Sequence, residues 1–228
     1  CAPGAEVCAL YGSTEAEPIA LQPWGKLPPD WRRRVAGGSG LPAGPPVSGI
    51  ALRILEDHSG QALPELSPEA FSALCLPAGE IGEIVVSGPL VQKGYCNPED
   101  DAETKIRVGD AVWHRTGDAG RLDADGVLWL LGRARAKVLA GGKPLYPFAV
   151  EAAASLFPQI RKAALATVRD KIILALEGGP LLPVQRASIL KMHPAVGAIR
   201  YLERIPVDRR HQSKVLYAEL ERLLQNDR

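Results

Sequence analysis

Residues 113–133 read W-H-R-T-G-D-A-G-R-L-D-A-D-G-V-L-W-L-L-G-R and contain the features that decide the fold. The segment 123–126 is a turn signal, and the apolar stretch 127–131 after it predicts a strand. Gly117 permits a tight bend immediately before the carboxylate of Asp118. In isolation this bend is equally consistent with a simple turn and with a functional site.

Further strands are predicted on the N-terminal side of this segment. Residues 49–55 alternate between apolar and other side chains, and residues 82–86 are rich in β-branched residues. Between them, Ser67 followed by Pro68 is a typical helix start, which predicts a single helical turn. We therefore expect a small antiparallel barrel or sheet.

After Gly132 the pattern changes to that of a separate α+β unit. Apolar periodicity predicts helices over 148–157, 184–192 and 213–224, a hairpin over 138–146, paired strands over 163–168 and 171–176, and a strand over 198–205. A stretch of this length with its own apolar faces is long enough to fold as a domain. The fold class expected for the whole chain is therefore α+β.

The N-terminal segment combines a short strand with a polar turn. Residues 7–10 are apolar and lead into Tyr-Gly-Ser-Thr-Glu at 11–15, a position in which functional residues often lie. Taken alone, this turn is weak evidence for a site, since a capped turn has the same composition. Residues 21–48 are rich in Pro and Gly and predict an extended surface connection with little regular structure.

Composition places the chain among globular proteins and excludes several partners. Of its 228 residues, 46% are hydrophobic and 23% are charged, and its formal net charge is +1. This balance predicts no nucleic-acid partner, and Arg32, Arg33 and Arg34 are interpreted as solvated loop charges. No apolar run is long enough for membrane insertion and no signal peptide is evident, so a cytoplasmic location is expected.

The four cysteines lack both the spacing of metal ligands and the density of a disulfide framework. We expect them to be reduced and buried as small hydrophobic residues. They are Cys1, Cys8, Cys75 and Cys96.

Several motifs occur together in a defined order, and this combination is far more specific than any one of them. They are the segments 11–15, 82–88 with 94–95, 115–118 and 132–133, followed by Pro147, Glu151 and Lys214. In order and spacing they resemble the adenylate-forming superfamily, which includes the acyl-CoA synthetases. The segments 76–86, 113–118 and 206–214 are similar to the fatty-acyl-CoA synthetase-like branch that contains the β-lactone synthetases of olefin biosynthesis.

This resemblance implies roles for the residues of the first motif. Glu15 would hold Mg²⁺, a hard cation that prefers carboxylate and phosphate oxygens, and Thr14 would lie beside the phosphates of ATP. Tyr11 would face the adenine ring, and Gly12 would belong to the same nucleotide site.

The later motifs supply the remaining implied roles. Asp118 would bind the ribose, because an ionised carboxylate can accept hydrogen bonds from both hydroxyls. Arg133 would lie near the ribose and the α-phosphate. Lys214 would be the catalytic lysine that reaches both the acyl oxygen and the α-phosphate. The implied ligands are ATP or AMP, Mg²⁺ and a small carboxylic acid, with CoA or an acyl carrier protein as acceptor.

Three positions depart from the family pattern, and one nearby histidine needs an interpretation. Arg135 replaces the usual acidic or Lys hinge residue, Leu139 replaces a usual Lys, and His114 replaces the commoner Tyr. His211 lies three residues before Lys214, and it is interpreted as a solvent-facing or packing residue rather than a catalytic base.

The phosphate-binding loop that precedes these motifs in the family is not found in the sequence. The segment 37–40 lacks the flanking residues to replace it, and Gly142-Lys143 does not have the spacing of a nucleotide P-loop. The resemblance therefore implies that residues 1–133 are the distal part of the large AMP-binding domain and residues 134–228 the mobile C-terminal domain. An N-terminal part of the large domain is expected before Cys1, and the chain alone is expected to be inactive.

Two hypotheses for function follow. In the first, the intact enzyme activates a carboxylic acid, expected to be a fatty or β-hydroxy fatty acid, as its adenylate and transfers the acyl group to CoA or a carrier thiol, or closes a β-lactone. In the second, the chain is a catalytically incomplete docking or regulatory module. The coding sequence upstream of Cys1 discriminates between them, because an in-frame phosphate loop favours the enzyme.

Overall fold

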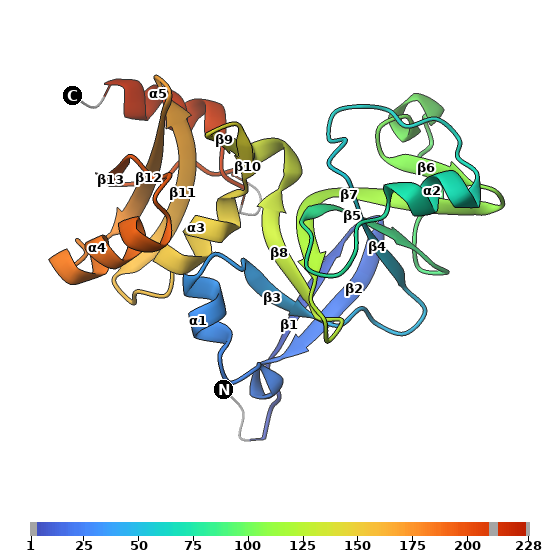
Figure 1. Ribbon diagram of the computed structural model, residues 1–228, viewed down its shortest axis with the longest axis horizontal. Helices are drawn as coiled ribbons and strands as arrows, with labels where there is room; N and C mark the ends of the chain where they lie inside the picture. Colours follow the sequence, from blue (N-terminus) through green and yellow to red (C-terminus); the bar gives the residue numbers. More distant parts are fainter. Residues whose placement is uncertain (1–3, 210–213, 227–228) are drawn as a thin grey trace. The chain divides into compact units, whose positions relative to one another are not determined.

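The computed structural model describes residues 4–209 and 214–226. The chain divides into two compact units, one formed by residues 1–31 and 41–135 and the other by residues 32–40 and 136–228. They are called unit 1 and unit 2 below. The α+β fold class is confirmed, because both units combine antiparallel strands with helices (Figure 1). The boundary after Arg133 and the mobility of the second domain stay predictions.

Unit 1 is built around a six-stranded antiparallel sheet. Its strands run in the order β3-β8-β7-β5-β4, and β6 pairs with β7. Their bounds are β3 Leu41–Gly44, β4 Ala51–Leu55, β5 Gly82–Ser87, β6 Lys105–Val108, β7 Ala111–Leu122 and β8 Leu128–Arg133. The turn predicted at 123–126 joins β7 to β8, and the Asp123 side chain accepts hydrogen bonds from the backbone of Asp125 and Val127.

Two cores lie on unit 1's sheet. One includes Ile54, Ile84 and Leu128, and the other includes Leu55, Val85 and Phe71. Phe71 belongs to α2 Pro68–Leu74, whose predicted cap is confirmed, because the Ser67 hydroxyl accepts a hydrogen bond from the Ala70 amide at 3.2 Å. Neighbouring residues of one strand therefore face different cores, as the alternation of a pleated strand requires.

A separate hairpin, β1 Cys8–Ser13 and β2 Ala16–Pro23, completes the regular strands of unit 1. The short 3-10 helices of the chain are η1 Trp24–Lys26, η2 Pro98–Asp101 and η3 Ala134–Ala136.

Unit 2 is a three-layer arrangement around a small sheet. Strands β11 Ile160–Val168 and β12 Lys171–Gly178 are antiparallel, and β13 Ala198–Leu202 runs parallel to β12. On one face they pack against α3 Pro147–Ala154 and α4 Pro183–Met192, and on the other against α5 Tyr217–Asn226 (Figure 1). The hairpin β9 Val138–Ala140 and β10 Lys143–Leu145 precedes α3.

Three expectations from the sequence are corrected. The stretch 21–48 is not mostly irregular, because it contains the end of β2, η1, α1 Trp31–Ala36 and β3. Arg32, Arg33 and Arg34 accordingly lie in a helix rather than a loop. The three described cysteines are not buried: Cys8 and Cys96 are exposed, Cys75 is half-buried, and all three are free thiols.

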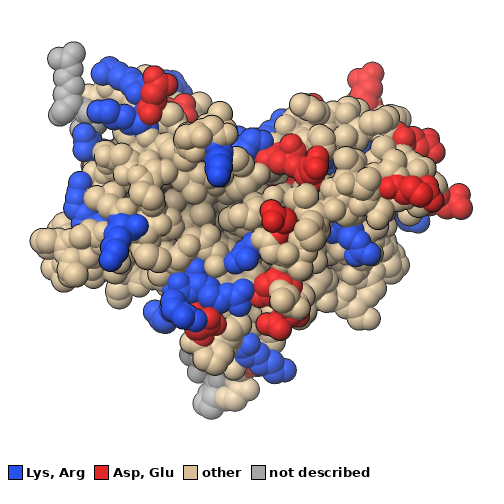
Figure 2. Space-filling model, viewed as in Figure 1, with Lys and Arg blue, Asp and Glu red and all other residues tan. Residues whose placement is uncertain are grey.

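The two units differ strongly in formal charge, although the whole chain is nearly neutral. Unit 1 contains 9 Lys and Arg against 18 Asp and Glu, whereas unit 2 contains 18 Lys and Arg against 8 Asp and Glu. Figure 2 shows acidic side chains over unit 1 and basic side chains over unit 2 on the face drawn. Unit 1 therefore produces a negative and unit 2 a positive electrostatic potential, although the net charge of the whole chain is close to zero.

Candidate active site

The β1–β2 hairpin brings the first motif to the edge of unit 1. Tyr11 and Ser13 belong to β1, and Thr14 and Glu15 form the turn that leads into β2. A Cβ atom on Gly12 would lie 2.9 Å from the carbonyl oxygen of Ala16 in the facing strand, so the hairpin requires glycine at this position. Thr14 is exposed at the tip. The nucleotide roles of Gly12 and Thr14 stay predictions.

Asp118 is presented by a bulge in β7. Opposite Glu83 to Val85 of β5, strand β7 runs from Ala119 to Arg115 and so contains extra residues. Gly117 in this bulge has φ +70°, a conformation that glycine adopts without strain. The bend that the sequence predicts before Asp118 is therefore a bulge that interrupts the pairing of β7 with β5, while Asp118 stays paired with Arg133 of β8.

The bulge is fixed by the hydroxyl group of Thr116. This group donates a hydrogen bond to the carbonyl of Ile84 at 3.0 Å and accepts one from the amide of Asp118 at 3.1 Å. These bonds hold the backbone of Asp118 in one conformation.

Three predicted nucleotide-binding residues meet at this carboxylate. The Tyr11 hydroxyl donates to Asp118 Oδ2 at 3.0 Å, and Arg133 Nη1 lies 3.3 Å from Asp118 Oδ1. Arg133 also donates to the Thr116 carbonyl at 3.1 Å. Side chains from β1, β7 and β8 thus form a cluster of one aromatic ring, one carboxylate and one guanidinium group, which is called the Asp118 cluster below.

Electrostatics keep Tyr11 neutral in this cluster. Burial of the phenol and the negative charge of Asp118 raise the pKa of Tyr11 well above its usual value. Tyr11 therefore remains a hydrogen-bond donor to Asp118. The Asp118 side chain is about one-fifth exposed and Arg133 about half exposed, so both can be reached from solvent.

Glu15 is linked to a second cluster that the sequence did not reveal. The Tyr95 hydroxyl donates to Glu15 Oε1 at 2.9 Å, although 80 residues separate the two. Burial alone would raise the pKa of Glu15, but hydrogen bonding to its carboxylate, including the bond from Tyr95, outweighs burial and the pKa falls. Glu15 is therefore ionised at neutral pH. Gly94-Tyr95 was recognised as a motif, yet no role for Tyr95 followed from it.

Lys105 and His114 are both buried, and Lys105 lies next to the ring of Tyr95, the partner of Glu15. Lys105 Nζ donates to the Gln92 carbonyl at 2.6 Å, lies 3.2 Å from His114 Nδ1 and stands 5.1 Å from the centre of the Tyr95 ring. Burial, and then the Lys105 ammonium, lower the pKa of His114 to about 4. The imidazole that replaces the family's common Tyr is therefore neutral, and its contacts are with Lys105 and the backbone.

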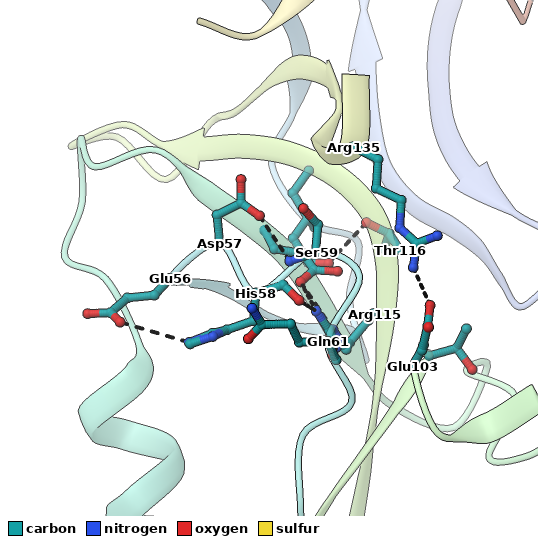
Figure 3. Close-up of polar contacts among 12 residues, drawn as sticks. Glu56, Asp57, His58, Ser59, Gln61, Glu103, Arg115, Thr116 and Arg135 are labelled. Atoms are coloured by element: carbon teal, nitrogen blue, oxygen red, sulfur yellow. Dashed lines mark hydrogen bonds and ion pairs between the residues drawn. The ribbon is translucent and has the colours of Figure 1, made fainter. Parts of the chain in front are cut away.

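Arg115 belongs to the same motif as Asp118, the segment 115–118, but its contacts give it a structural role. Its side chain is 2% exposed and forms an ion pair with Glu83, and it also donates to the carbonyls of His58 and Gln61 (Figure 3). These contacts attach the loop after β4 to the central strand β7. Arg115 therefore stabilises the sheet that carries Asp118.

Two residues that depart from the family pattern follow β8 in the chain. Arg135, at the position of the family's hinge residue, forms an ion pair with Glu103 (Figure 3). Leu139, in place of the usual Lys, is 67% exposed on the β9–β10 hairpin. Neither residue belongs to the Asp118 cluster.

Lys214 belongs to unit 2 and is exposed. The predicted helix start at residue 213 is wrong: α5 begins at Tyr217, and Lys214 lies before it, next to the bridge between Val207 and Val215. Its backbone is held by Asp208, since the Lys214 amide donates to Asp208 Oδ1 at 2.8 Å and the Asp208 amide donates to the Lys214 carbonyl at 2.9 Å. His211 lies outside the described residues.

The donor chemistry of unit 1 fits the implied ligands. An ionised, half-buried carboxylate such as Glu15 suits Mg²⁺, which is commonly bound by one or two carboxylates together with substrate phosphates. Over residues 4–209 and 214–226, no group of three or more His, Cys, Asp and Glu side chains is close enough to bind a metal by itself. In that same part of the chain, no helix is long and apolar enough to span a membrane.

Comparison with known proteins identifies relatives of this arrangement. The family model described as AMP-binding enzyme matches residues 1–96. An olefin beta-lactone synthetase from Xanthomonas campestris is 33% identical over 90% of this chain, and the putative acyl-CoA ligase YdaB from Bacillus subtilis is 33% identical over 71% of it. The matches cover 40% and 27% of these relatives, so the chain spans well under half of their length.

Solved structures agree with these sequence matches. O-succinylbenzoate coenzyme A synthetase from Bacillus subtilis, in complex with AMP, superposes with a TM-score of 0.68 at 25% identity, covering 95% of this chain and 41% of that one. Apo MatB from Rhodopseudomonas palustris gives a TM-score of 0.67 at 21% identity and shows the same fold over 96% of this chain. Residues 1–96 thus match the AMP-binding enzyme family, and most of the chain is similar to enzymes of the adenylate-forming superfamily.

Proposed function

We propose that this chain forms part of an AMP-forming ligase that activates a carboxylic acid with ATP and then passes the acyl group to an acceptor. The observation that carries the proposal is the Asp118 cluster, in which Tyr11, Asp118 and Arg133 converge from three strands. A ring beside a carboxylate and a guanidinium group suits a nucleoside phosphate, because each part of the nucleotide meets a complementary group.

Within this function, Asp118 accepts hydrogen bonds from the ribose hydroxyls, and Tyr11 presents its ring to the base. Arg133, which is paired with Asp118 and about half exposed, reaches the α-phosphate from beside the ribose. Glu15 would hold Mg²⁺, which would neutralise negative charge on the phosphates, and the exposed Thr14 at the hairpin tip would contact those phosphates. Tyr95 donates a hydrogen bond to the Glu15 carboxylate and so helps to keep it oriented and ionised.

Lys214 completes the machinery in the adenylation step. Its ammonium group binds the attacking carboxylate and the α-phosphate, and so neutralises the charge that develops as pyrophosphate leaves. A flexible, exposed lysine suits this role because it must reach two oxygen atoms that approach each other during the reaction. Loss of one such donor typically costs about 3 to 4 kcal/mol in the transition state.

A fatty or β-hydroxy fatty acid is the proposed substrate class, supported by similarity to the olefin beta-lactone synthetase. The excess of Lys and Arg in unit 2 supports an anionic acceptor, such as CoA or an acidic carrier protein. Closure of a β-lactone would need no acceptor and is the alternative fate of the adenylate.

The test is ATP–pyrophosphate exchange across a panel of carboxylic acids, followed by mass spectrometry of the product. It uses the chain expressed with every residue that its gene encodes, which is called the complete gene product below. Acid-dependent exchange that is lost in Asp118→Ala supports the enzyme. A complete gene product that exchanges with none of the acids, yet is folded, would instead support the docking or regulatory module.

A further inference from the structure

The loop that carries Lys214 is anchored at both of its ends by carboxylates of unit 2. Its described residues are 206–209 and 214–216, between β13 and α5, and they are called the Lys214 loop below. At its entry, Glu177 Oε2 of β12 accepts a hydrogen bond from the Ile205 amide at 2.9 Å. At its exit, the hydroxyl of Tyr217, the first residue of α5, lies 3.5 Å from Glu151 Oε1.

Glu151 lies in an unusual environment for a carboxylate. It is 6% exposed, on a helix whose other buried residues are apolar, and its Oε1 also accepts the Leu165 amide at 2.7 Å. Leu165 belongs to β11, the edge strand of the sheet, so this bond satisfies an amide at the sheet edge. A glutamine would satisfy the same amide without the cost of burying a charge.

Glu177 is likewise sheltered, with a side chain 16% exposed, and Arg161 Nε lies 3.5 Å from its second oxygen. Ile205, which donates to Glu177, is fully buried against α5, in a core that includes Leu220 and Leu224. The chain therefore leaves this core at Ile205 and returns to it at Val215 and Tyr217, and Lys214 between these points is exposed.

Backbone hydrogen bonds connect the two anchored ends of the loop to Lys214. The Leu216 amide donates to the Pro206 carbonyl at 3.0 Å, and Val207 pairs with Val215. Lys214 itself exchanges two hydrogen bonds with Asp208, one step further from the core. The described residues of the loop thus form a short ladder between its two anchored ends, so we expect that displacement of either end would move Lys214.

We propose that Glu151 and Glu177 are positioning residues for Lys214, acting through the two ends of the Lys214 loop. The inference rests on the proposed function, because it assigns Lys214 its role in adenylation. Catalytic groups must be held within a fraction of an ångström of their working geometry, so a loosened loop lowers the adenylation rate without unfolding the protein.

The first experiment measures the loop directly and needs no activity. In Tyr217→Phe, which removes only the hydroxyl that faces Glu151, the amides of Lys214 and Leu216 should exchange with solvent about three- to tenfold faster. The amide of Leu174 in the core should not change. Tyr201→Phe is the matched control, because the Tyr201 hydroxyl accepts the Leu181 amide at 3.0 Å, away from the loop. Unchanged exchange at Lys214 and Leu216 in Tyr217→Phe would overturn the proposal.

The second experiment is a double-mutant cycle in the complete gene product. Glu151→Ala should lower the rate of ATP–pyrophosphate exchange about tenfold or more, whereas Glu151→Gln, which keeps an acceptor for Leu165 and Tyr217, should restore most of it. Glu177→Ala and Glu177→Gln should behave in the same way. In a Lys214→Ala background, Glu151→Ala should lower the rate less than twofold further, because its effect passes through Lys214.

The outcomes separate this inference from the proposed function. Equal losses for Glu151→Ala in both backgrounds would show that Glu151 acts independently of Lys214, and would overturn the inference while leaving adenylation established. A Lys214→Ala variant with the parental rate would remove the catalytic role of Lys214, and the positioning role with it. An equal loss of thioester formation from a supplied acyl-adenylate would indicate a general structural defect, and would also overturn the inference.

Discussion

The hydroxyl of Tyr11 donates a hydrogen bond to Asp118 Oδ2 at 3.0 Å, across 107 residues of sequence. This contact connects the β1–β2 hairpin to the central strand of the unit 1 sheet, two elements that carry different family motifs. Because burial and the Asp118 charge raise the pKa of Tyr11, the contact persists through the neutral range. It leaves Oδ1 of Asp118 to Arg133, so the three residues act as one site.

Asp118→Ala should therefore weaken ATP binding about tenfold or more without unfolding the protein, because it removes the acceptor for the ribose and the partner of both neighbours. Tyr11→Phe keeps the ring and removes only the hydroxyl, so its effect on ATP binding should be smaller. Calorimetric titration of ATP into the complete gene product measures both, with thermal unfolding as the control. An unchanged ATP affinity in Asp118→Ala would remove this residue from the site.

The buried ion pair of Arg115 and Glu83 gives a prediction about stability. Arg115→Ala should lower the free energy of unfolding by about 3 to 5 kcal/mol, because it leaves the Glu83 carboxylate buried without a partner. Replacing both residues, as in Arg115→Met with Glu83→Leu, should cost less than Arg115→Ala alone. Urea unfolding of the three proteins checks this order, and a double variant less stable than Arg115→Ala would contradict it.

Local sequence signals predicted the local elements well. Ser67 caps α2, Gly117 forms the bulge before Asp118, and the segment 123–126 turns between β7 and β8. Each depends on residues within a few positions of one another, so the amino-acid types alone define the conformation. The strands were predicted for a similar reason, because alternation reports which side of a strand is buried.

Contacts between distant segments were not predicted. Tyr95 meets Glu15, and Lys105 is buried beside His114, only because the fold brings together the β1–β2 turn, the segment between β5 and η2, and the paired strands β6 and β7. A buried lysine has no distinctive sequence pattern, because its burial depends on polar partners supplied by other elements. The helix start at residue 213 was placed too early for a related reason, since backbone pairing with Asp208 overrides helical periodicity around Lys214.

Glu151 should make stability depend on pH. Burial, the largest cause, raises the pKa of Glu151 to about 7, above the value of about 4.5 expected for the unfolded chain. Between these values the folded protein holds a proton that the unfolded chain releases, so the contribution of Glu151 to stability is complete below pH 4.5 and declines as the pH rises to about 7. The full change is about 3 kcal/mol.

Glu151→Gln cannot titrate and should remove this part of the pH dependence. The measurement is the difference in unfolding free energy between the parent and Glu151→Gln, taken from about pH 5 to 8. The difference should shift in favour of the Gln variant as the pH rises, and level off above about pH 7. A difference that stays constant over this range would show that Glu151 has an ordinary pKa in the folded protein.

The charge difference between the units predicts a salt-dependent acceptor step. If the basic residues of unit 2 attract an anionic thiol, the KM for CoA should rise about threefold or more between about 0.02 and 0.2 M salt, because the Debye length shortens to about 7 Å over this range. Pantetheine, which carries the same thiol without phosphates, is the matched control and should show a much weaker dependence. Equal salt dependence for the two thiols would contradict this role for unit 2.

Lys214 offers the sharpest separation of catalysis from stability. Its side chain is exposed, and the two hydrogen bonds that hold it to Asp208 use its backbone amide and carbonyl, which alanine retains. Lys214 also lies before the first residue of α5, so its removal does not alter the first turn of that helix. Lys214→Ala should therefore unfold at the same temperature as the parent.

Adenylation should nevertheless fall about 100-fold or more in Lys214→Ala, because the transition state loses the cation that bridges the attacking carboxylate and the α-phosphate. Thioester formation from a supplied acyl-adenylate should change much less, since that step no longer involves attack on the α-phosphate. Lys191→Ala, which removes another exposed lysine from unit 2, is the control and should leave both steps unchanged. A Lys214→Ala protein that forms adenylate at the parental rate would show that the catalytic role of the family's lysine does not extend to this residue.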